Sequence, residues 1–211
     1  MILDAEEMRV LGCLLEKEIT TPEYYPLTAN ALVNACNQKS NRDPVMHLSE
    51  DDVINALDRL RHKGLSFIQT GAGMRVPKYG HRIPEALNLG RRELALMCEL
   101  MLRGPQTLGE LRARSERMHR FDDLDEVERC LRGLMTREPE PLVTRLDRWP
   151  GSKEPRYAQL LSGEPAQPSS QQTSEAAPNP RTDRIAALET EVADLRARLE
   201  ALEAQIRDLL S

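Results

Sequence analysis

The 211-residue sequence has no apolar run that approaches the roughly 20 residues needed for a membrane-spanning helix. Its first ten residues, MILDAEEMRV, carry acidic side chains where a secretory signal peptide would carry positive charge. We therefore expect a cytoplasmic protein that makes no contact with a membrane.

The sequence also lacks the residue spacings typical of metal sites and catalytic centres. Its four cysteines, Cys13, Cys36, Cys98 and Cys130, lie too far apart for a C-x-x-C motif, and its four histidines show no helical pair spacing. The GAG sequence at 71–73 lacks the following helix that a phosphate-binding loop requires. We expect reduced, buried thiols, no metal, no cofactor and no enzymatic activity.

An excess of positive charge is absent as well, because the chain has a net charge of −5. The charge is uneven along the chain: residues 1–88 carry −2, residues 89–162 carry +1 and residues 163–211 carry −4. Phosphate groups are attracted by lysine and arginine, so the middle segment suits a nucleic acid best, although weakly.

Two segments of the chain resemble each other. DDVINALDRL (51–60) and DEVERCLRGL (125–134) share their apolar spacing at an offset of 74 residues, and VLGCLLE (10–16) aligns with ALMCELM (95–101) at an offset of 85. The offsets differ by 11 residues. The first unit therefore contains an insertion between its first and third helices.

Each unit has the periodicity of three helices followed by two short strands. Helix starts are marked by capping pairs, namely Asp4 with Glu7, Ser49 with Asp52, and Thr107 with Glu110. This order is that of a winged helix. We predict a mainly α protein with small β-hairpins (α+β), with one winged-helix domain over 1–88 and a second over 89–162.

The remainder of the chain has two different patterns. Residues 163–183 are rich in Pro, Ser, Gln and Ala and contain no large apolar residue, which predicts a disordered linker. Residues 184–211 carry four heptads with Ile185, Leu188, Val192, Leu195, Leu199, Leu202, Ile206 and Leu209 at the core positions. Core and flanking residues favour a parallel coiled-coil homodimer. The alternative is a single helix that docks back onto the domains.

The stretch CNQKSNRDPV (36–45) offers an amide or cationic donor at nearly every position. Asn30, Asn34 and Asn37 precede it at helical spacing, although Asn is a poor helix former. We predict a contact surface for a nucleic acid or a protein partner, made by Asn30, Asn34, Asn37, Gln38, Lys39, Asn41 and Arg42. The alternative is local turn bonding with solvated cations.

A second cationic group lies in the second unit. It contains Arg112, Arg114, Arg117 and Arg120 after the capping pair, and Arg145, Arg148, Lys153 and Arg156 in the hairpin region. These side chains suit phosphate contacts, and the alternative is a solvated face. In both units the third helix begins with acids, which suit the helix dipole but repel phosphate.

The segments LGCLLEKEITTPEYYPLTANALVNACNQKSNRDPVMHLSE (11–50) and LRGPQTLGELRARSERMHRFDDLDEVE (102–128) resemble the YceH family of uncharacterised bacterial proteins. The resemblance implies tandem winged-helix domains in a small cytoplasmic protein. It implies no activity, ligand or catalytic residue.

Two functions fit these observations. The first is a dimeric protein that binds double-stranded DNA, as a transcriptional regulator, with the cations on phosphates and the amides near bases. The second is a non-catalytic interaction module that docks a partner protein through the asparagine face. The acidic third helices favour the second function, whereas the arginine clusters favour the first.

Overall fold

The computed structural model describes residues 2–71, 75–148 and 154–165, all of which belong to one compact unit, Met1–Gln167. The segment expected to form a coiled coil, 184–211, and all but the first three residues of the expected linker lie outside the described residues. No helix in the described ranges is long and apolar enough to cross a membrane.

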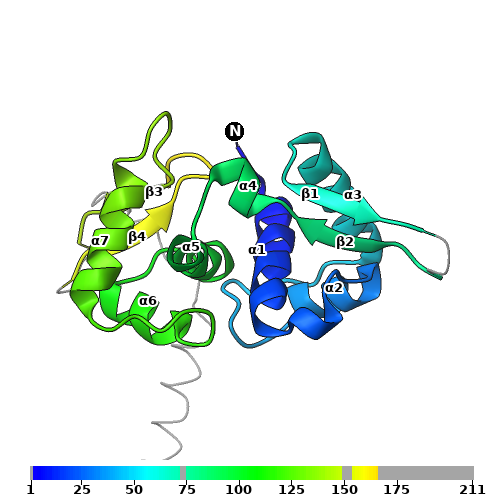
Figure 1. Cartoon of the computed structure of the whole chain (residues 1–211), viewed down its shortest axis with the longest axis horizontal. Coiled ribbons are helices and arrows are strands. Elements are labelled where there is room, and N and C mark those ends of the chain that lie inside the picture. Colours follow the sequence, from blue (N-terminus) through cyan, green and yellow to red (C-terminus); the bar gives the residue numbers. More distant parts are fainter. Residues whose placement is uncertain (1, 72–74, 149–153, 166–211) are drawn as a thin grey trace, which may run out of the picture. The chain divides into compact units, whose positions relative to one another are not determined.

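The described residues form two lobes that repeat the same order of elements (Figure 1). Lobe 1 contains α1 (Ala5–Thr20), the short 3-10 helix η1 (Pro22–Tyr24), α2 (Ala29–Cys36), α3 (Glu50–His62), β1 (Ser66–Gln69), β2 (Lys78–His81) and α4 (Ile83–Leu87). Lobe 2 contains α5 (Arg91–Arg103), α6 (Leu108–Ser115), α7 (Leu124–Met135), β3 (Val143–Leu146) and β4 (Arg156–Gln159). The mixed α+β fold predicted from the sequence is confirmed.

Helix starts follow the capping chemistry of the sequence. Asp4 and Glu7 exchange bonds at the start of α1, at 2.8 Å in each direction, and Ser49 with Asp52 does the same for α3. Such reciprocal bonds satisfy backbone N–H groups that a helix end leaves without partners. Gly64 follows α3 with φ of +73°, a conformation that glycine adopts at little cost.

Each lobe contains a two-stranded antiparallel sheet after its third helix. Ser66 pairs with His81 in the first hairpin, and Arg145 pairs with Tyr157 in the second. An additional bridge joins each hairpin to the segment before the second helix, between Leu27 and Tyr79 in lobe 1 and between Gln106 and Tyr157 in lobe 2. The hairpins are thereby fixed to the helices of their own lobe.

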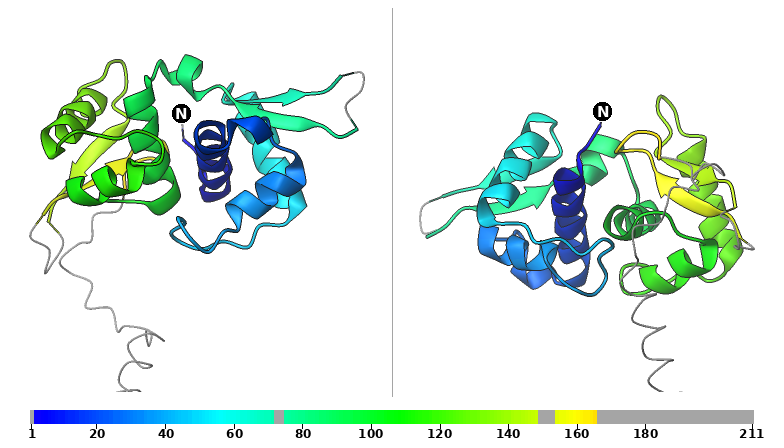
Figure 2. Two further views of the ribbon diagram at one scale, coloured as in Figure 1. Left: turned by 60° about the horizontal axis from the view of Figure 1, so that its bottom comes forward. Right: turned by 180° about the vertical axis from the view of Figure 1, so that it is seen from behind.

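The two lobes pack against each other through their first helices, α1 and α5 (Figures 1 and 2). Gly12 permits this contact, because a Cβ atom at this position would lie 2.9 Å from Leu102 Cδ2. The Cys98 thiol donates a hydrogen bond to the Gly12 carbonyl at 3.5 Å. Leu3 N also donates to Leu161 O at 2.7 Å, so both ends of the unit contribute to the same joint.

Candidate functional site

Arg42, from the donor-rich stretch, lies inside the protein and not on a contact surface. Its side chain is 0% exposed, and Nη2 donates to Glu16 Oε2 at 2.5 Å. The other donors reach Glu16 Oε1, Gln38 Oε1 and the carbonyls of Ala35 and Asn41. All five N–H groups of the guanidinium therefore have acceptors, and the prediction that Arg42 contacts a ligand is wrong.

The neighbouring amides are also used internally. Asn37 donates through Nδ2 to Leu48 O at 2.8 Å and accepts at Oδ1 from Leu48 N at 2.7 Å. Asn41 has φ of +58°, which asparagine tolerates better than most residues, and its Oδ1 accepts a hydrogen bond from Arg103 of lobe 2. The local turn-bonding alternative describes this part of the stretch better than a ligand surface does.

Arg117 of lobe 2 reaches the same buried carboxylate as Arg42. It donates to Glu16 Oε1 and, at 3.3 Å, to Glu99 Oε1 on α5, while Arg103 Nε lies 3.1 Å from Glu99 Oε2. We define Glu16, Arg42, Glu99, Arg103 and Arg117 as the joint network. It contains three cations and two carboxylates, and it connects α1 and the donor-rich stretch to lobe 2.

The two carboxyl groups of the joint network, Glu16 and Glu99, have pKa values that are shifted in opposite directions. Burial alone would raise the pKa of the Glu16 carboxyl, but the hydrogen bond and charge of Arg42, together with Arg117, hold this pKa below its usual value. Burial raises the pKa of Glu99, and Arg117 and Arg103 offset this only in part. Glu16 is therefore the carboxylate whose ionised form the folded protein stabilises.

The side chains of two further predicted contact residues, Arg114 and Arg156, make hydrogen bonds within lobe 2. Arg114 donates to Gln106 Oε1 at 2.8 Å and to Glu110 Oε1 at 3.3 Å. Arg156 donates to Glu110 Oε2 and to Pro105 O, both at 2.8 Å. These arginines share one carboxylate at the start of α6, so their charge is partly neutralised within the protein.

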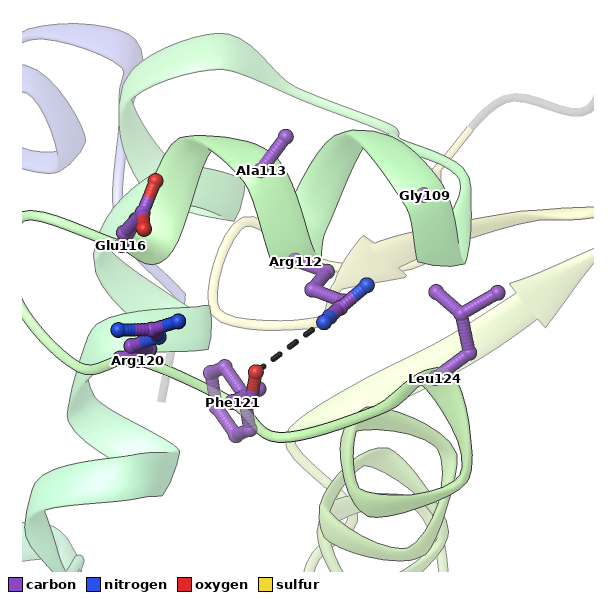
Figure 3. A pocket seen from close by; sticks show the side chains of 7 residues that line it. All are labelled: Gly109, Arg112, Ala113, Glu116, Arg120, Phe121 and Leu124. Atoms are coloured by element: carbon purple, nitrogen blue, oxygen red, sulfur yellow. Dashed lines mark hydrogen bonds between the residues drawn. The ribbon is translucent and has the colours of Figure 1, made fainter.

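The remaining predicted contact residues stay on the surface. Arg112 donates only to backbone carbonyls, including Phe121 O at 3.4 Å, and together with Arg120 it lines a pocket of about 410 Å³ (Figure 3). Figure 3 shows Leu124, from the start of α7, among the side chains that line this pocket. Six residues are exposed, and their side chains make no hydrogen bond or ion pair with the described residues: Asn30, Asn34, Lys39, Arg120, Arg145 and Arg148. Lys153 lies outside the described residues, as do the predicted dimerisation residues.

Sequence reasoning missed the acids of the joint network. Glu16 and Glu99 both lie in apolar helical segments, VLGCLLE and ALMCELM, and both are fully buried. The sequence did contain a signal for these residues, namely an acid within an apolar helical segment. Such an acid indicates a buried ion pair, because a buried carboxylate requires a cation or several hydrogen-bond donors. The donor-rich stretch supplies one such cation, Arg42.

A model of the family described as "Protein of unknown function, DUF480" matches residues 3–152. The chain belongs to this family. The chain is also similar to proteins that are called UPF0502 proteins. One from Citrifermentans bemidjiense is 61% identical over 163 residues, covering 77% of this chain and 75% of the relative. One from Pelobacter propionicus is 55% identical and covers 99% of this chain and 96% of the relative.

These matches confirm the expectation of an uncharacterised bacterial family. A UPF0502 protein from Koribacter versatilis extends the likeness, at 53% identity over 99% of this chain and 97% of the relative. None of these three names states a ligand or an activity. The YceH name stays a prediction.

Proposed function

We propose that the protein binds double-stranded DNA without catalysing a reaction, that each lobe is a winged helix, and that lobe 2 makes the phosphate contacts. The order of three helices and a hairpin in both lobes supports the winged-helix assignment. In proteins of the related helix-turn-helix class, a recognition helix lies in the major groove and neighbouring elements contact the backbone.

The observation that carries the proposal is a group of exposed arginines on α7 and the second hairpin. Arg145 lies opposite Tyr157 in the second hairpin, and α7, which carries Arg132, packs against β3. This packing supports a common face for α7 and the hairpin. Burial raises the pKa of the Tyr157 phenol, and the charges of Arg145 and Arg132 offset this only in part. We define Arg132, Arg145 and Arg148 as the lobe 2 cation face.

The charges on this face are largely available to a ligand. Arg145 and Arg148 pair with no carboxylate among the described residues, and Arg132 lies 3.5 Å from Glu128 in an exposed pair. Exposed pairs of this kind contribute little free energy, so a phosphate can replace the carboxylate at small cost. Phosphate contacts give affinity without base specificity.

Lobe 1 is less suited to DNA. Its third helix begins with Glu50, Asp51 and Asp52, of which the first two are exposed, and Arg42 is buried in the joint network. Acids also begin α7 of lobe 2, so the two lobes differ in their cations: Arg42 of lobe 1 is buried, whereas Arg145 and Arg148 of lobe 2 are exposed and can contact phosphate. We therefore assign the phosphate contacts to one lobe of each chain.

The predicted coiled coil over 184–211 completes the proposal. A parallel homodimer carries two lobe 2 cation faces, which raises the apparent affinity when both faces reach one duplex. A cytoplasmic transcriptional regulator is the biological role that we propose for such a dimer.

A second candidate function is the docking of a partner protein on lobe 1. Asn30 and Asn34 are exposed on α2, and their side chains make no hydrogen bond with other described residues. Their amides can bond to the backbone or side chains of a partner. The acidic start of α3 does not oppose this function, because the partner need not be anionic.

Binding of the full-length chain to a random DNA duplex, followed by fluorescence anisotropy across a salt series, separates the two functions. Three phosphate contacts for each lobe 2 predict that log K falls with log salt at a slope of about −3 per bound lobe. The absence of binding at about 50 mM salt would reject the DNA proposal and favour partner docking.

A further inference from the structure

A cavity of about 570 Å³ lies between the start of α5 and the middle of α7. Its lining includes Arg91, Arg92 and Glu93 from α5, His119 from the loop before α7, and Glu126, Arg129 and Cys130 from α7. Three guanidinium groups and two carboxylates from two helices thus surround one cavity. The proposed DNA contact does not use this cavity, because none of the three arginines of the lobe 2 cation face lines it.

The positive charges of the cavity are only partly neutralised. Arg92 Nη1 lies 3.1 Å from Glu126 Oε1, and Glu93 Oε2 accepts a hydrogen bond from Gly90 N at 2.7 Å. Arg91 and Arg129 are exposed and pair with no carboxylate among the described residues. Two guanidinium groups therefore remain without a counter-ion in the described part of the chain.

Cys130 contributes a neutral group to the cavity wall. Its thiol is half-buried, and burial raises its pKa to about 11, with the charge of Glu93 acting in the same direction. The thiol is therefore protonated at neutral pH. It adds no negative charge that would repel an anion from the two free arginines.

We propose that this cavity binds a small oxyanion with two or more negative charges, either a phosphate compound or a polycarboxylate. Guanidinium groups present planar, paired N–H donors that match the oxygen atoms of both classes. Two such groups without counter-ions favour a multivalent ligand over a monovalent one. The volume accommodates a ligand larger than a single phosphate group.

The test uses Cys130 as a reporter in the full-length chain. Cys13, Cys36 and Cys98 are buried, so N-ethylmaleimide should react first at Cys130, and mass spectrometry identifies the modified peptide. Inorganic pyrophosphate and citrate are added separately, with potassium chloride at equal ionic strength as the control. We expect a bound oxyanion to slow the alkylation of Cys130 by about fivefold or more, because it occupies the cavity and excludes the reagent.

The variant Arg91→Gln removes one free guanidinium from an exposed helix start. The concentration for half-protection should rise by about tenfold, since a charge-assisted contact is lost. The rate without an added anion is measured for this variant as well, so that protection is expressed relative to the variant's own basal rate. The matched control Arg148→Gln removes a cation of the lobe 2 cation face, and protection by the anion should remain as in the unmodified protein.

Protection by pyrophosphate alone supports a phosphate ligand, and protection by citrate alone supports a polycarboxylate. Protection by both supports the shared oxyanion chemistry. Protection by neither anion, together with no heat of binding in calorimetry of the same samples, would overturn the proposal. Equal protection by potassium chloride, or equal loss in Arg91→Gln and Arg148→Gln, would overturn it as well. None of these outcomes depends on whether the protein binds DNA.

Discussion

Glu16 on α1 and Arg42 in the loop after α2 form an ion pair in which both side chains are 0% exposed. Arg117 of lobe 2 donates to the same carboxylate. The cation that the sequence offers as a ligand contact thus joins the two lobes. This relationship explains the role of Arg42 in the stretch: its guanidinium satisfies a buried carboxylate and the backbone carbonyls of Ala35 and Asn41.

Removal of Arg42 should strongly destabilise the protein. In the Arg42→Met variant, Glu16 loses its buried partner, and the remaining contact with Arg117 is one-third exposed. A buried charge left without its partner costs about 3–5 kcal/mol in the free energy of unfolding. Urea denaturation of the variant and the unmodified chain measures this difference.

The matched control is Arg61→Met, which removes an arginine from an exposed pair with Asp58 at 3.0 Å. Its effect should be below about 1 kcal/mol. The double variant Glu16→Gln with Arg42→Met should lose less stability than the sum of its single variants, because the two residues interact directly. A loss for Arg42→Met as small as that for Arg61→Met would contradict the role of the joint network.

The close contact of α1 with α5 should make Gly12 intolerant of a larger side chain. A Cβ atom at Gly12 would lie 2.9 Å from Leu102 Cδ2 and 3.3 Å from Met101 Cβ, and both of these residues are buried. We expect Gly12→Val to lower the free energy of unfolding by about 1–3 kcal/mol through overpacking. Thermal unfolding with calorimetry provides the measurement.

Gly133 on α7 provides the comparison, because a Cβ atom there would have no neighbour within 4 Å. Gly133→Ala should raise the free energy of unfolding by about 0.5–1 kcal/mol, since alanine favours a helix more than glycine does. Stabilisation by both substitutions would show that the lobes have room to separate at Gly12.

Acid should weaken the joint network through Glu16. The pKa of Glu16 is lowered in the folded protein, so its contribution to stability is present above the unfolded pKa of about 4.3 and is lost as the pH falls further. The variant Glu16→Gln should be less stable than the unmodified chain at pH 7, and the difference should shrink only as the pH falls below about 4.3. Urea midpoints measured from pH 7 to pH 3 give this comparison.

The contribution of Glu99 to the stability of the protein should change with pH in the opposite direction from that of Glu16. Its pKa is raised by burial in the folded protein, so the contribution of its protonated form is lost as the pH rises. The difference between Glu99→Gln and the unmodified chain should therefore depend on pH in the opposite direction from that of Glu16→Gln. A parallel pH dependence for both variants would contradict the assignment of Glu16 as the stabilised anion.

Much of the fold was predictable because its signals are local. The capping pairs and the apolar spacing place the starts of α1, α3 and α6 correctly, as Asp4, Ser49 and Thr107 show. The short helix α4 was not predicted. It directly follows a hairpin, where pairing across the chain outweighs local propensity.

The candidate site was less predictable, because the position of a charge depends on contacts between distant residues. Arg42 and Arg148 both lie in polar, cationic stretches of the sequence. Arg42 is nevertheless buried beside Glu16, whereas Arg148 is exposed. The partners of Arg117 lie 101 and 18 residues away along the chain. A sequence pattern identifies donors, but only the fold shows which acceptors lie within reach.

The most direct test of the DNA proposal compares two charge variants in the salt series. Arg145→Gln with Arg148→Gln removes two cations from the lobe 2 cation face, whereas Lys39→Gln with Arg61→Gln removes two exposed cations from lobe 1. We predict that the lobe 2 variant binds DNA more weakly and that its salt slope is shallower by about 2 per bound lobe, while the lobe 1 variant keeps the affinity and slope of the unmodified chain. Equal slopes in the two variants would contradict the assignment of DNA binding to lobe 2.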